Sequence, residues 1–366
     1  MKRKLGDIAS ITMGQSPSSD TYNSSEGLPF FQGNADFGKL YPTVRIYCNA
    51  PIRIANPNDI LISVRAPIGA INIADRECCI GRGLAAIDGS PLVSNKFIFY
   101  FLNASKDKLI AQGTGSTFKS IGKDALHNLQ FPVPSLPEQE RIVAELDLLS
   151  GIIEKQKAQL RELDTLAQSI FDSSFKDALY SSPKTTLEEV ADYFIGLTYK
   201  PENVSEEGTI VLRSSNIQEN RLDFKDIVRV NSKVDAKKIV KDGDILMCSR
   251  NGSAKLVGKV ARIGKLDEDM SFGAFMTIIR SDYNDYLFHF FLSEHFRSQL
   301  STAKTATINQ ITTKMLDKIK LNVPTLEQQK IFAEKFDGIN KQRELIHNSL
   351  ADSQRLLEVS MNKYFG

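Results

Sequence analysis

The sequence predicts an α+β protein in which two pseudo-repeated mixed α/β lobes are separated by two long helices packed as an antiparallel coiled coil. Three observations lead to this prediction: a heptad pattern in the middle of the chain, a weaker one near its C-terminal end, and a recurring order of short motifs around both. The chain has 366 residues, which is enough for two or three domains with packed cores.

The stretch from Glu138 to Tyr180 carries the first heptad pattern. Apolar residues recur there at alternating spacings of three and four, which is typical of a helix that pairs along one face. A capping box of Ser135 and Glu138, with Pro137 in the first turn, predicts where this helix begins. Pro183 predicts its end. At about 1.5 Å per residue the helix would be roughly 60 Å long, too long for the core of one small domain.

A second helix of the same kind is predicted near the C-terminus. It begins after Pro324 with Thr325 and Gln328 as its capping box, and its opening residues match those of the first helix with one proline deleted. Its seam is more polar than the first. Neither helix can bury its apolar stripe alone, so we expect the two to pack against each other. The predicted helix-pairing residues are Leu146, Leu149, Ile153, Leu160, Leu163, Ile170, Phe336, Ile339, Ile346, Leu350 and Leu357.

The first lobe is predicted to contain short strands, one helix and polar loops. β-branched and apolar runs bounded by Gly, Pro and Asn predict the strands, and apolar residues at helical spacing predict the helix. A flexible polar loop closes the lobe just before the first long helix. The expected positions are strands within 5–14, 59–65, 70–73 and 84–87, a helix at 94–103 and the loop at 112–121.

The second lobe repeats this order. The Asp-Ile-Leu run at 59–61 recurs at 244–246, an offset of 185, and the polar segment 117–121 recurs at 307–311, an offset of 190. The offset changes because the loops differ in length, while the order of elements persists as in a tandem duplication. Antiparallel pairing of the helices would relate the two halves by a pseudo-two-fold axis.

Composition favours a reduced cytoplasmic location. No run of eighteen apolar residues exists, so we expect no membrane span, and the N-terminus lacks the apolar core of a signal peptide. Cys48, Cys78, Cys79 and Cys248 form no CxxC pair and show no spacing suited to a disulfide framework.

The net charge of +2 is unevenly distributed along the chain. Residues 1–130 carry fourteen Lys plus Arg against ten Asp plus Glu, whereas residues 138–180 carry five against nine. Residues 185–318 balance at nineteen each. A basic first lobe is compatible with a polyanionic partner, and an acidic helix is better suited to contacts with another helix or protein.

The sequence predicts no catalytic residue and no metal site. Residues 81–86 fit a GxGxxA pattern, but the residues after it are typical of a strand rather than of a helix that opens on a dinucleotide. The segment 115–123 lacks the spacing of a Walker A loop. The four histidines have no metal-ligand spacing, and no Asn/Asp-Pro-Pro-aromatic tetrapeptide marks an amino-methyltransferase.

Polar, donor-rich loops remain as the candidate functional feature. Arg pairs bidentately with guanine, Asn and Gln pair with adenine, and Lys, Ser or Thr bind phosphate. We expect the loops at 113–120 and 302–310 to contain the more direct base contacts, although each side chain taken singly is more typical of an ordinary surface residue or an internal salt bridge. The candidate DNA-binding residues are Gln32, Asn34, Arg65, Lys119, Ser120, Arg213, Asn216, Arg250, Asn251, Asn309 and Gln310.

The chain resembles the specificity (S) subunit of Type I restriction–modification systems over essentially its whole length. The resemblance depends on the duplicated order of several motifs, each of which is loose by itself. These motifs are Leu5-Gly6-Asp7-Ile8-Ala9, Asp59-Ile60-Leu61, Arg82-Gly83-Leu84, the segment from Phe131 to Gln139, and the segment from Leu321 to Gln328.

The resemblance implies a non-catalytic DNA-recognition subunit in which each lobe reads one half of a bipartite target. It implies target recognition domains at 1–134 and 183–323, a central conserved helix at 135–182 and a C-terminal conserved helix at 324–366. The helices would set the gap between the half-sites and dock modification subunits, which we expect to number two. Restriction subunits complete the family's complex, and S-adenosylmethionine, ATP and Mg²⁺ belong to the partner subunits, with no cofactor in this chain.

Two other interpretations fit parts of the sequence. A coiled-coil scaffold or interaction protein without a DNA-reading role would also need the paired helices, and it predicts no salt-sensitive binding to duplex DNA. An enzyme with an unrecognised site predicts turnover by the isolated chain.

Overall fold

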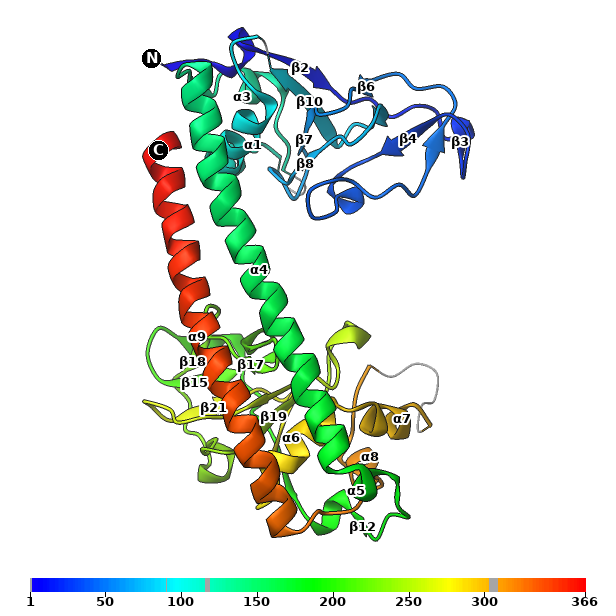
Figure 1. Ribbon diagram of the computed structural model, residues 1–366, viewed down its shortest axis with the longest axis vertical. Helices are drawn as coiled ribbons and strands as arrows, with labels where there is room; N and C mark the ends of the chain where they lie inside the picture. The colour runs from blue at the N-terminus through cyan, green and yellow to red at the C-terminus, as the bar shows by residue number, and fades with distance from the viewer. Residues whose placement is uncertain (1, 90, 116–118, 303–308) are drawn as a thin grey trace. The chain divides into compact units, whose positions relative to one another are not determined.

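The computed structural model describes residues 2–89, 91–115, 119–302 and 309–366. The chain forms two compact units, the first comprising Met1–Ala158 with Ile346–Gly366 and the second comprising Gln159–Leu345. Each unit contains one mixed α/β lobe together with parts of both long helices, α4 (Leu136–Ser174) and α9 (Leu326–Phe365) (Figure 1).

The first lobe contains a four-stranded antiparallel sheet in the order β2-β10-β7-β8 and a five-stranded sheet in the order β3-β5-β4-β9-β6, in which β4 and β9 are parallel. β1 pairs with β11. The strands are β1 (Lys2–Lys4), β2 (Ala9–Met13), β3 (Tyr22–Asn23), β4 (Leu28–Phe31), β5 (Tyr47–Cys48), β6 (Ile54–Ala55), β7 (Ile60–Ser63), β8 (Ile71–Ile73), β9 (Cys78–Ile80), β10 (Leu84–Gly89) and β11 (Gln130–Pro132). The helices are α1 (Asn95–Ala104), α2 (Lys106–Ala111) and α3 (Lys123–His127).

The second lobe repeats this topology. Its four-stranded sheet has the order β13-β22-β19-β20, and a second sheet, β14-β18-β15-β21, contains the parallel pair β15–β21. β12 pairs with β23, and β16 with β17. The strands are β12 (Thr185–Thr186), β13 (Asp192–Ile195), β14 (Val204–Ser205), β15 (Thr209–Leu212), β16 (Ile217–Gln218), β17 (Arg221–Leu222), β18 (Arg229–Val230), β19 (Ile245–Cys248), β20 (Val260–Arg262), β21 (Met270–Phe272), β22 (Met276–Arg280) and β23 (Lys320–Leu321). The helices are α5 (Lys176–Tyr180), α6 (Asn284–Leu292), α7 (Glu294–Thr302) and α8 (Thr313–Leu316).

The first long helix ends earlier than the heptad pattern predicts. A single helix was expected as far as Tyr180, but α4 ends at Ser174, and Phe175 leaves the helical conformation with φ −116° and ψ 21° before α5 begins. The Phe175 ring is 1% exposed and packs against Tyr286 and Phe332, with ring centroids 5.1 and 5.0 Å away. Burial of this ring in the second lobe therefore accompanies the break, a tertiary effect that local propensity does not contain.

Both long helices begin with the same arrangement, and the predicted deletion of one proline is wrong. The Nε2 of Gln139 donates to the carbonyl of Pro134 at 3.0 Å, and the Nε2 of Gln329 donates to the carbonyl of Pro324 at 2.9 Å. Gln329 lies 190 residues after Gln139, as Pro324 does after Pro134, so the two helix starts align without a gap.

The capping boxes of the two helices differ. At the start of α9, the Thr325 amide donates to Oε1 of Gln328 at 2.9 Å and the Gln328 amide donates to Oγ1 of Thr325 at 3.2 Å, as predicted. At the start of α4, the Glu138 carboxylate is instead bonded by the guanidinium of Arg141, at 2.8 and 2.9 Å. An arginine one turn further along thus engages the carboxylate that a capping box would use.

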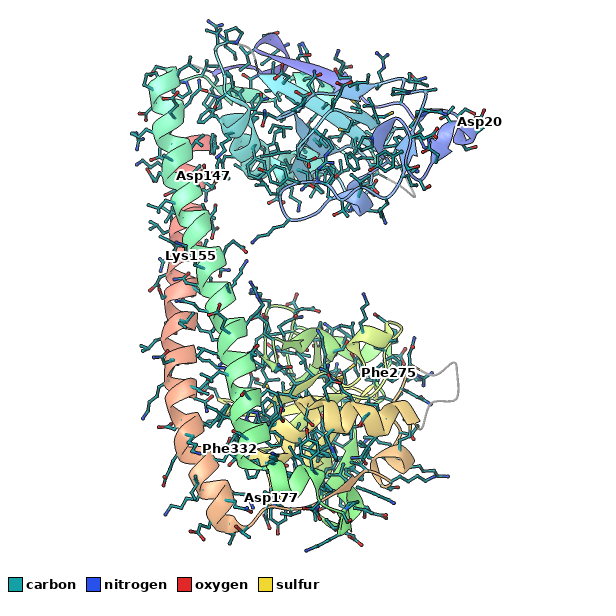
Figure 2. All side chains as sticks on the ribbon, turned by 45° about the vertical axis from the view of Figure 1, so that its right-hand side comes forward. Asp20, Asp147, Lys155, Asp177, Phe275 and Phe332 are labelled. Carbon is teal, nitrogen blue, oxygen red and sulfur yellow. The ribbon has the colours of Figure 1, made fainter. Side chains whose placement is uncertain are left out.

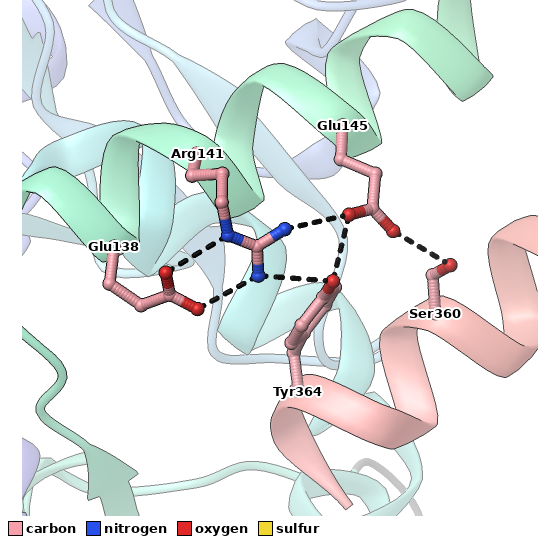
Figure 3. A network of polar contacts seen from close by, with 5 residues as sticks. All are labelled: Glu138, Arg141, Glu145, Ser360 and Tyr364. Carbon is pink, nitrogen blue, oxygen red and sulfur yellow. Dashed lines mark hydrogen bonds and ion pairs between the residues drawn. The ribbon is translucent and has the colours of Figure 1, made fainter.

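Within the first unit, α4 and α9 pack antiparallel through a polar network at one end. Tyr364 donates its hydroxyl proton to Glu145 at 2.8 Å, and Ser360 donates to the same carboxylate at 3.3 Å (Figure 3). Arg141 bridges Glu138 and Glu145 beside them. Further along the pair, Gln156 donates to Ser349 at 2.8 Å. The amide nitrogen of Gln156 therefore has a partner across the pair, whereas its buried Oε1 has none among the described residues.

Within the second unit, the same two helices pack through aromatic rings and one ion pair. Arg343 is 8% exposed and its guanidinium binds the Asp164 carboxylate. Phe171 and Phe332 meet across the helices with centroids 5.9 Å apart, and the Phe332 ring stacks on that of Phe336 at 5.5 Å. Together with the duplicated lobes, this pairing confirms the predicted fold class.

The predicted helix-pairing residues are all buried or partly buried in the structure. Leu146, Leu149, Ile153, Leu160 and Ile339 are buried. The remaining ones are partly buried: Leu163, Ile170, Phe336, Ile346, Leu350 and Leu357. In the part of the chain that the structure describes, no helix is both long and apolar enough to cross a membrane.

Candidate nucleic-acid interface

In the first lobe, Gln32 and Asn34 lie in the turn that follows β4. The Asp36 carboxylate fixes this turn by accepting from the Gln32 amide at 2.7 Å and from the Gly33 amide at 3.3 Å. Asp36 is itself buried and paired with Arg45. The Gln32 side chain is exposed and that of Asn34 is partly exposed, so both remain accessible on a rigid turn.

Arg65, Lys119 and Ser120 are brought together after β7. Arg65 forms an antiparallel bridge with Ser120, and the Ala66 amide donates to the Lys119 carbonyl at 3.1 Å. The Ile121 amide donates to the Val64 carbonyl at 2.9 Å, which anchors the end of the polar loop to the sheet. Arg65 and Lys119 are exposed.

A shallow cleft of about 220 Å³ joins the two groups of residues. It is lined by Gln32, Asn34 and Arg65 together with Ser16 and Arg82. Arg82 was not predicted as a DNA-binding residue, although Arg82-Gly83-Leu84 is one of the motifs on which the family resemblance depends. Among the described residues, neither Arg65 nor Arg82 has a salt-bridge partner, so two free guanidinium groups border one cleft.

The second lobe brings Arg250, Asn251, Asn309 and Gln310 together in the same way. Arg250 bridges Gln310 as Arg65 bridges Ser120, and the Asn251 amide donates to the Asn309 carbonyl at 3.2 Å. The Asn309 side chain donates to the carbonyl of Gly252 at 2.9 Å. The repeat position predicted from the sequence is thus also a structural equivalence.

Arg213 and Asn216 occupy the turn after β15, where Gln32 and Asp36 lie in the first lobe. The Arg213 amide donates to Oδ1 of Asn216 at 2.8 Å, and the Asn216 Nδ2 donates to the carbonyls of Asp223 and Asp226 at 2.9 Å. Asn216 is 1% exposed. Its amide therefore holds the turn and is not presented to a base, contrary to expectation, because the pattern of the sequence cannot distinguish a buried turn amide from an exposed one.

The Arg213 side chain is also occupied by contacts within its own lobe. Its guanidinium binds Asp226 at 2.6 Å, and the neighbouring Ser214 hydroxyl accepts from the Asn251 side chain at 3.0 Å. Of the predicted base-contacting loops, residues 116–118 and 303–308 lie outside the described part of the chain.

The described residues show neither a cluster of metal-ligating side chains nor a lowered thiol pKa at Cys78 or Cys248. No group of three or more His, Cys, Asp or Glu side chains is placed to hold a metal ion in the ranges the structure describes. Burial raises the pKa of the Cys78 thiol to about 12 and also raises the pKa of Cys248, so both stay protonated at neutral pH.

Two duplicated lobes, each with an exposed arginine at an equivalent position beside polar side chains, are typical of a modular recognition protein. The chain belongs to the family described as Type I restriction modification DNA specificity domain, which matches residues 1–163 and 183–352. The predicted resemblance is therefore confirmed.

Two curated relatives are specificity subunits from Methanocaldococcus jannaschii. The putative type I restriction enzyme MjaX specificity subunit is 42% identical over 164 residues, which cover 44% of this chain and 39% of that relative. The matched segment thus spans about two fifths of the length of the MjaX subunit. The MjaVIII specificity subunit is 24% identical over 84% of this chain and 78% of that relative. The expectation of a specificity subunit rather than a catalytic one agrees with these names.

Among solved structures, the S subunit of a Type I restriction–modification system from M. genitalium covers 100% of this chain. The match covers 96% of that structure with a TM-score of 0.53 and 16% sequence identity. At this identity the likeness concerns the fold alone.

Proposed function

We propose that the chain is the DNA-recognition subunit of a Type I restriction–modification complex and that each lobe reads one half of a bipartite target. The observation that carries this proposal is the equivalence of two exposed arginines, Arg65 and Arg250, each bridged to a polar loop residue at the same place in its lobe. Arginine and amide side chains on a rigid turn are suited to base edges in the major groove.

The residues around these arginines differ between the lobes, as expected for readers of different sequences. Ser120 stands where Gln310 stands in the second lobe, and the free guanidinium of Arg82 has no cationic counterpart there. Family membership supports DNA as the partner, and the basic first lobe is compatible with it.

The two long helices set the gap between the half-sites and dock the modification subunits in this proposal. α4 and α9 are 39 and 40 residues long, and cross-helix bonds such as Gln156 to Ser349 and Arg343 to Asp164 fix their register. We assign the target recognition domains to 1–134 and 183–323 and the conserved helices to 135–182 and 324–366.

The partners in this proposal are double-stranded DNA, two modification subunits and the restriction subunits. S-adenosylmethionine, ATP and Mg²⁺ act on those partners, and this chain contributes recognition without a reaction of its own.

A domain exchange tests modular recognition. Residues 183–323 are replaced by the corresponding lobe of another family member, and the methylated sites are mapped in cells that also express the modification subunits. We expect one half-site to change while the other half and the gap stay the same. A change in both halves would contradict the proposal.

A helix insertion tests the spacing role. Seven residues added to the middle of α4 and seven to the facing part of α9 keep the seams in register and should alter the preferred gap in the mapped sites. An unchanged gap would mean that the helices do not set it.

Salt dependence separates recognition from scaffolding. A DNA reader should lose affinity for its duplex steeply between 50 and 200 mM salt, by about three or more orders of magnitude if six or more phosphates are contacted. Salt-insensitive or absent binding by the complex would favour a scaffold.

A further inference from the structure

The second lobe presents an exposed aromatic ring at a position where the first lobe has no side chain. Gly83 and Phe275 are equivalent because the Val64 amide donates to the Gly83 carbonyl at 2.9 Å and the Ser249 amide donates to the Phe275 carbonyl at 3.0 Å. The turns that precede these residues also agree. The Gly81 amide donates to the Phe31 carbonyl at the end of β4 at 2.8 Å, and the Gly273 amide donates to the Leu212 carbonyl at the end of β15 at 2.9 Å.

The first lobe cannot carry a side chain at this point. A Cβ atom on Gly83 would lie 2.4 Å from the Gln32 carbonyl oxygen, a distance that requires the backbone to move. The chemistry of the first lobe here comes instead from the guanidinium groups of Arg65 and Arg82, which line the cleft beside Gln32. The large side chains that line the cleft of the first lobe are therefore polar or charged.

The second lobe fixes Phe275 firmly at its surface. Its carbonyl accepts three hydrogen bonds, from the Ser249 amide, the Ser249 hydroxyl and the Arg250 amide, each at 3.0 Å. The side chain is nevertheless 56% exposed, and Figure 2 shows it at the outer surface of the lobe. A single exposed ring is common on protein surfaces, but this one lies beside Arg250 and at the position that corresponds to the cleft residue Gly83 of the first lobe.

Arg250 covers part of that ring. Its guanidinium carbon lies 5.3 Å from the centre of the Phe275 ring, within the range of a cation–π contact. The pair combines a positive charge, which attracts a polyanion, with an apolar ring edge that has no hydrogen-bonding capacity. On the major-groove edge of duplex DNA the one apolar group is the 5-methyl group of thymine, and a phenylalanine side chain is suited to contact it.

We propose that Phe275, supported by Arg250, is a specificity-determining residue of the second lobe and contacts the 5-methyl group of a thymine in the half-site that this lobe reads. This inference rests on the proposed function and adds the chemical group that is recognised. It also predicts that the two lobes use different chemistry, guanidinium contacts in the first and an apolar contact in the second.

Single-base replacement tests the proposal. The complex with its modification subunits binds duplexes in which each thymine of the second lobe's half-site is replaced, one at a time, by deoxyuridine, which lacks only the 5-methyl group. For the unaltered chain we expect one position at which the replacement weakens binding by about fivefold, the value for removing one buried methyl-sized group. For Phe275→Ala, the same replacement should have no further effect. Phe224→Ala, which removes another exposed ring of this lobe, should keep the fivefold sensitivity.

Failure of this proposal is distinguishable from failure of the proposed function. If the unaltered complex binds its duplex specifically but no thymine is sensitive, if the half-site contains no thymine, or if Phe275→Ala keeps the sensitivity, the methyl contact is refuted while DNA recognition stands. If no specific binding occurs, the proposed function fails first. Should Phe275→Ala fail to fold, Phe275→Gln takes its place. It presents a polar amide to the methyl group, so the sensitivity should be lost, and sensitivity retained in folded Phe275→Gln would overturn the proposal. Stacking on a base, in contrast, would leave deoxyuridine without effect.

Discussion

Tyr100 of α1 and His289 of α6 occupy the same position in the two lobes, yet their surroundings differ. Tyr100 donates its hydroxyl proton to Asp147 of α4 at 2.7 Å, and Lys96 binds the same carboxylate at 2.6 Å. His289 is 3% exposed and lies among the rings of Phe171, Phe332 and Phe336, with centroids 4.4–5.7 Å away. At this position the first lobe is thus joined to α4 by polar contacts and the second lobe to both helices by a buried aromatic cluster. Elsewhere the first lobe also packs aromatic rings, Phe97 and Phe101, on Phe365 of α9.

This difference teaches that one backbone arrangement can be stabilised by two kinds of chemistry. Polar contacts at a partly exposed surface contribute little each and tolerate substitution, whereas a close-packed cluster of rings is sensitive to loss of volume and to a buried charge. The two units should therefore respond differently to truncation, to acid and to changes in salt. Hydrogen exchange measured by mass spectrometry follows each unit separately.

The largest effect is expected from Phe332→Ala. The ring is 2% exposed and touches Phe171, Phe175 and Phe336, so its removal leaves a cavity and should lower the stability of the second unit by about 3–5 kcal/mol. Leu326→Ala, at an 81% exposed position of the same helix, is the control and should change little. Equal losses of exchange protection for the two variants would contradict the importance of the cluster.

Acid should weaken the second unit before the first. Burial, with smaller contributions from Arg343 and Arg262, lowers the pKa of His289 from 6.5 to about 3. The unfolded chain takes up a proton below pH 6.5 that the folded unit does not, so stability falls as the pH drops from 6.5 toward 3, by at most about 1.4 kcal/mol per pH unit.

The equivalent Tyr100 does not titrate in that range, because the ordinary pKa of a tyrosine hydroxyl is about 10, and burial and the Asp147 hydrogen bond raise it further. His289→Phe is the matched variant and should remove the extra acid sensitivity of the second unit. If exchange protection in both units declines in parallel between pH 6.5 and 4.5, or if His289→Phe leaves the profile of the second unit unchanged, this explanation fails.

The ion pair in the second half of the seam should show an asymmetric response. Asp164→Asn leaves the Arg343 guanidinium, 8% exposed, without its counter-charge and should cost about 1–3 kcal/mol. Arg343→Ile introduces the residue that the first half of the seam has at the same place, Ile153, and should be close to neutral. Urea unfolding measures both variants. If Asp164→Asn is more stable than Arg343→Ile, the expected asymmetry is contradicted.

The smallest effect is expected in the polar network of the first unit. Tyr364→Phe removes one hydrogen bond from the partly exposed Glu145 and should cost at most about 1 kcal/mol. Tyr364 is the main cause that lowers the pKa of Glu145 below 4.5, so stability from this carboxylate is present above pH 4.5 and is lost as the pH falls through its lowered value. The variant should reduce that acid dependence in the first unit, whereas Ser353→Ala, on the same helix, should not.

Periodicity predicts the frame of this molecule well, because heptads and capping residues act locally. The Thr325 and Gln328 box and the apolar seam positions depend on spacing alone. The break at Phe175 does not follow from spacing alone, since burial of the Phe175 ring in the second lobe accompanies it. The alignment of the helix starts was misjudged because the second helix has Glu327 where the first has Pro137, and only the equivalent bonds of Gln139 and Gln329 reveal the true register.

The candidate interface was predicted less completely, because exposure is a tertiary property. Arg65 and Arg250 were identified by their repeat position, and the structure brings each to a polar loop residue. Asn216 has the right chemistry but is enclosed by its own turn. Arg82 and Phe275 were not identified as candidate contacts from the sequence. They are recognised only when the turns 81–83 and 273–275 are compared through their equivalent backbone hydrogen bonds.

Equivalent positions of the two long helices are separated by a constant number of residues, and this limits the insertions and deletions that the helices can accept. Phe365 follows Phe175 by 190 residues, as Gln329 follows Gln139, whereas equivalent strands of the lobes differ by between 181 and 192. Surface loops absorb insertions at little cost. A single residue inserted into α4 before Leu160 would rotate the following part of the helix by about 100° and turn Leu160 and Ala167 away from α9. Insertions and deletions can therefore accumulate in the surface loops of the lobes, whereas the long helices permit only those that keep the apolar seam on the same helix face.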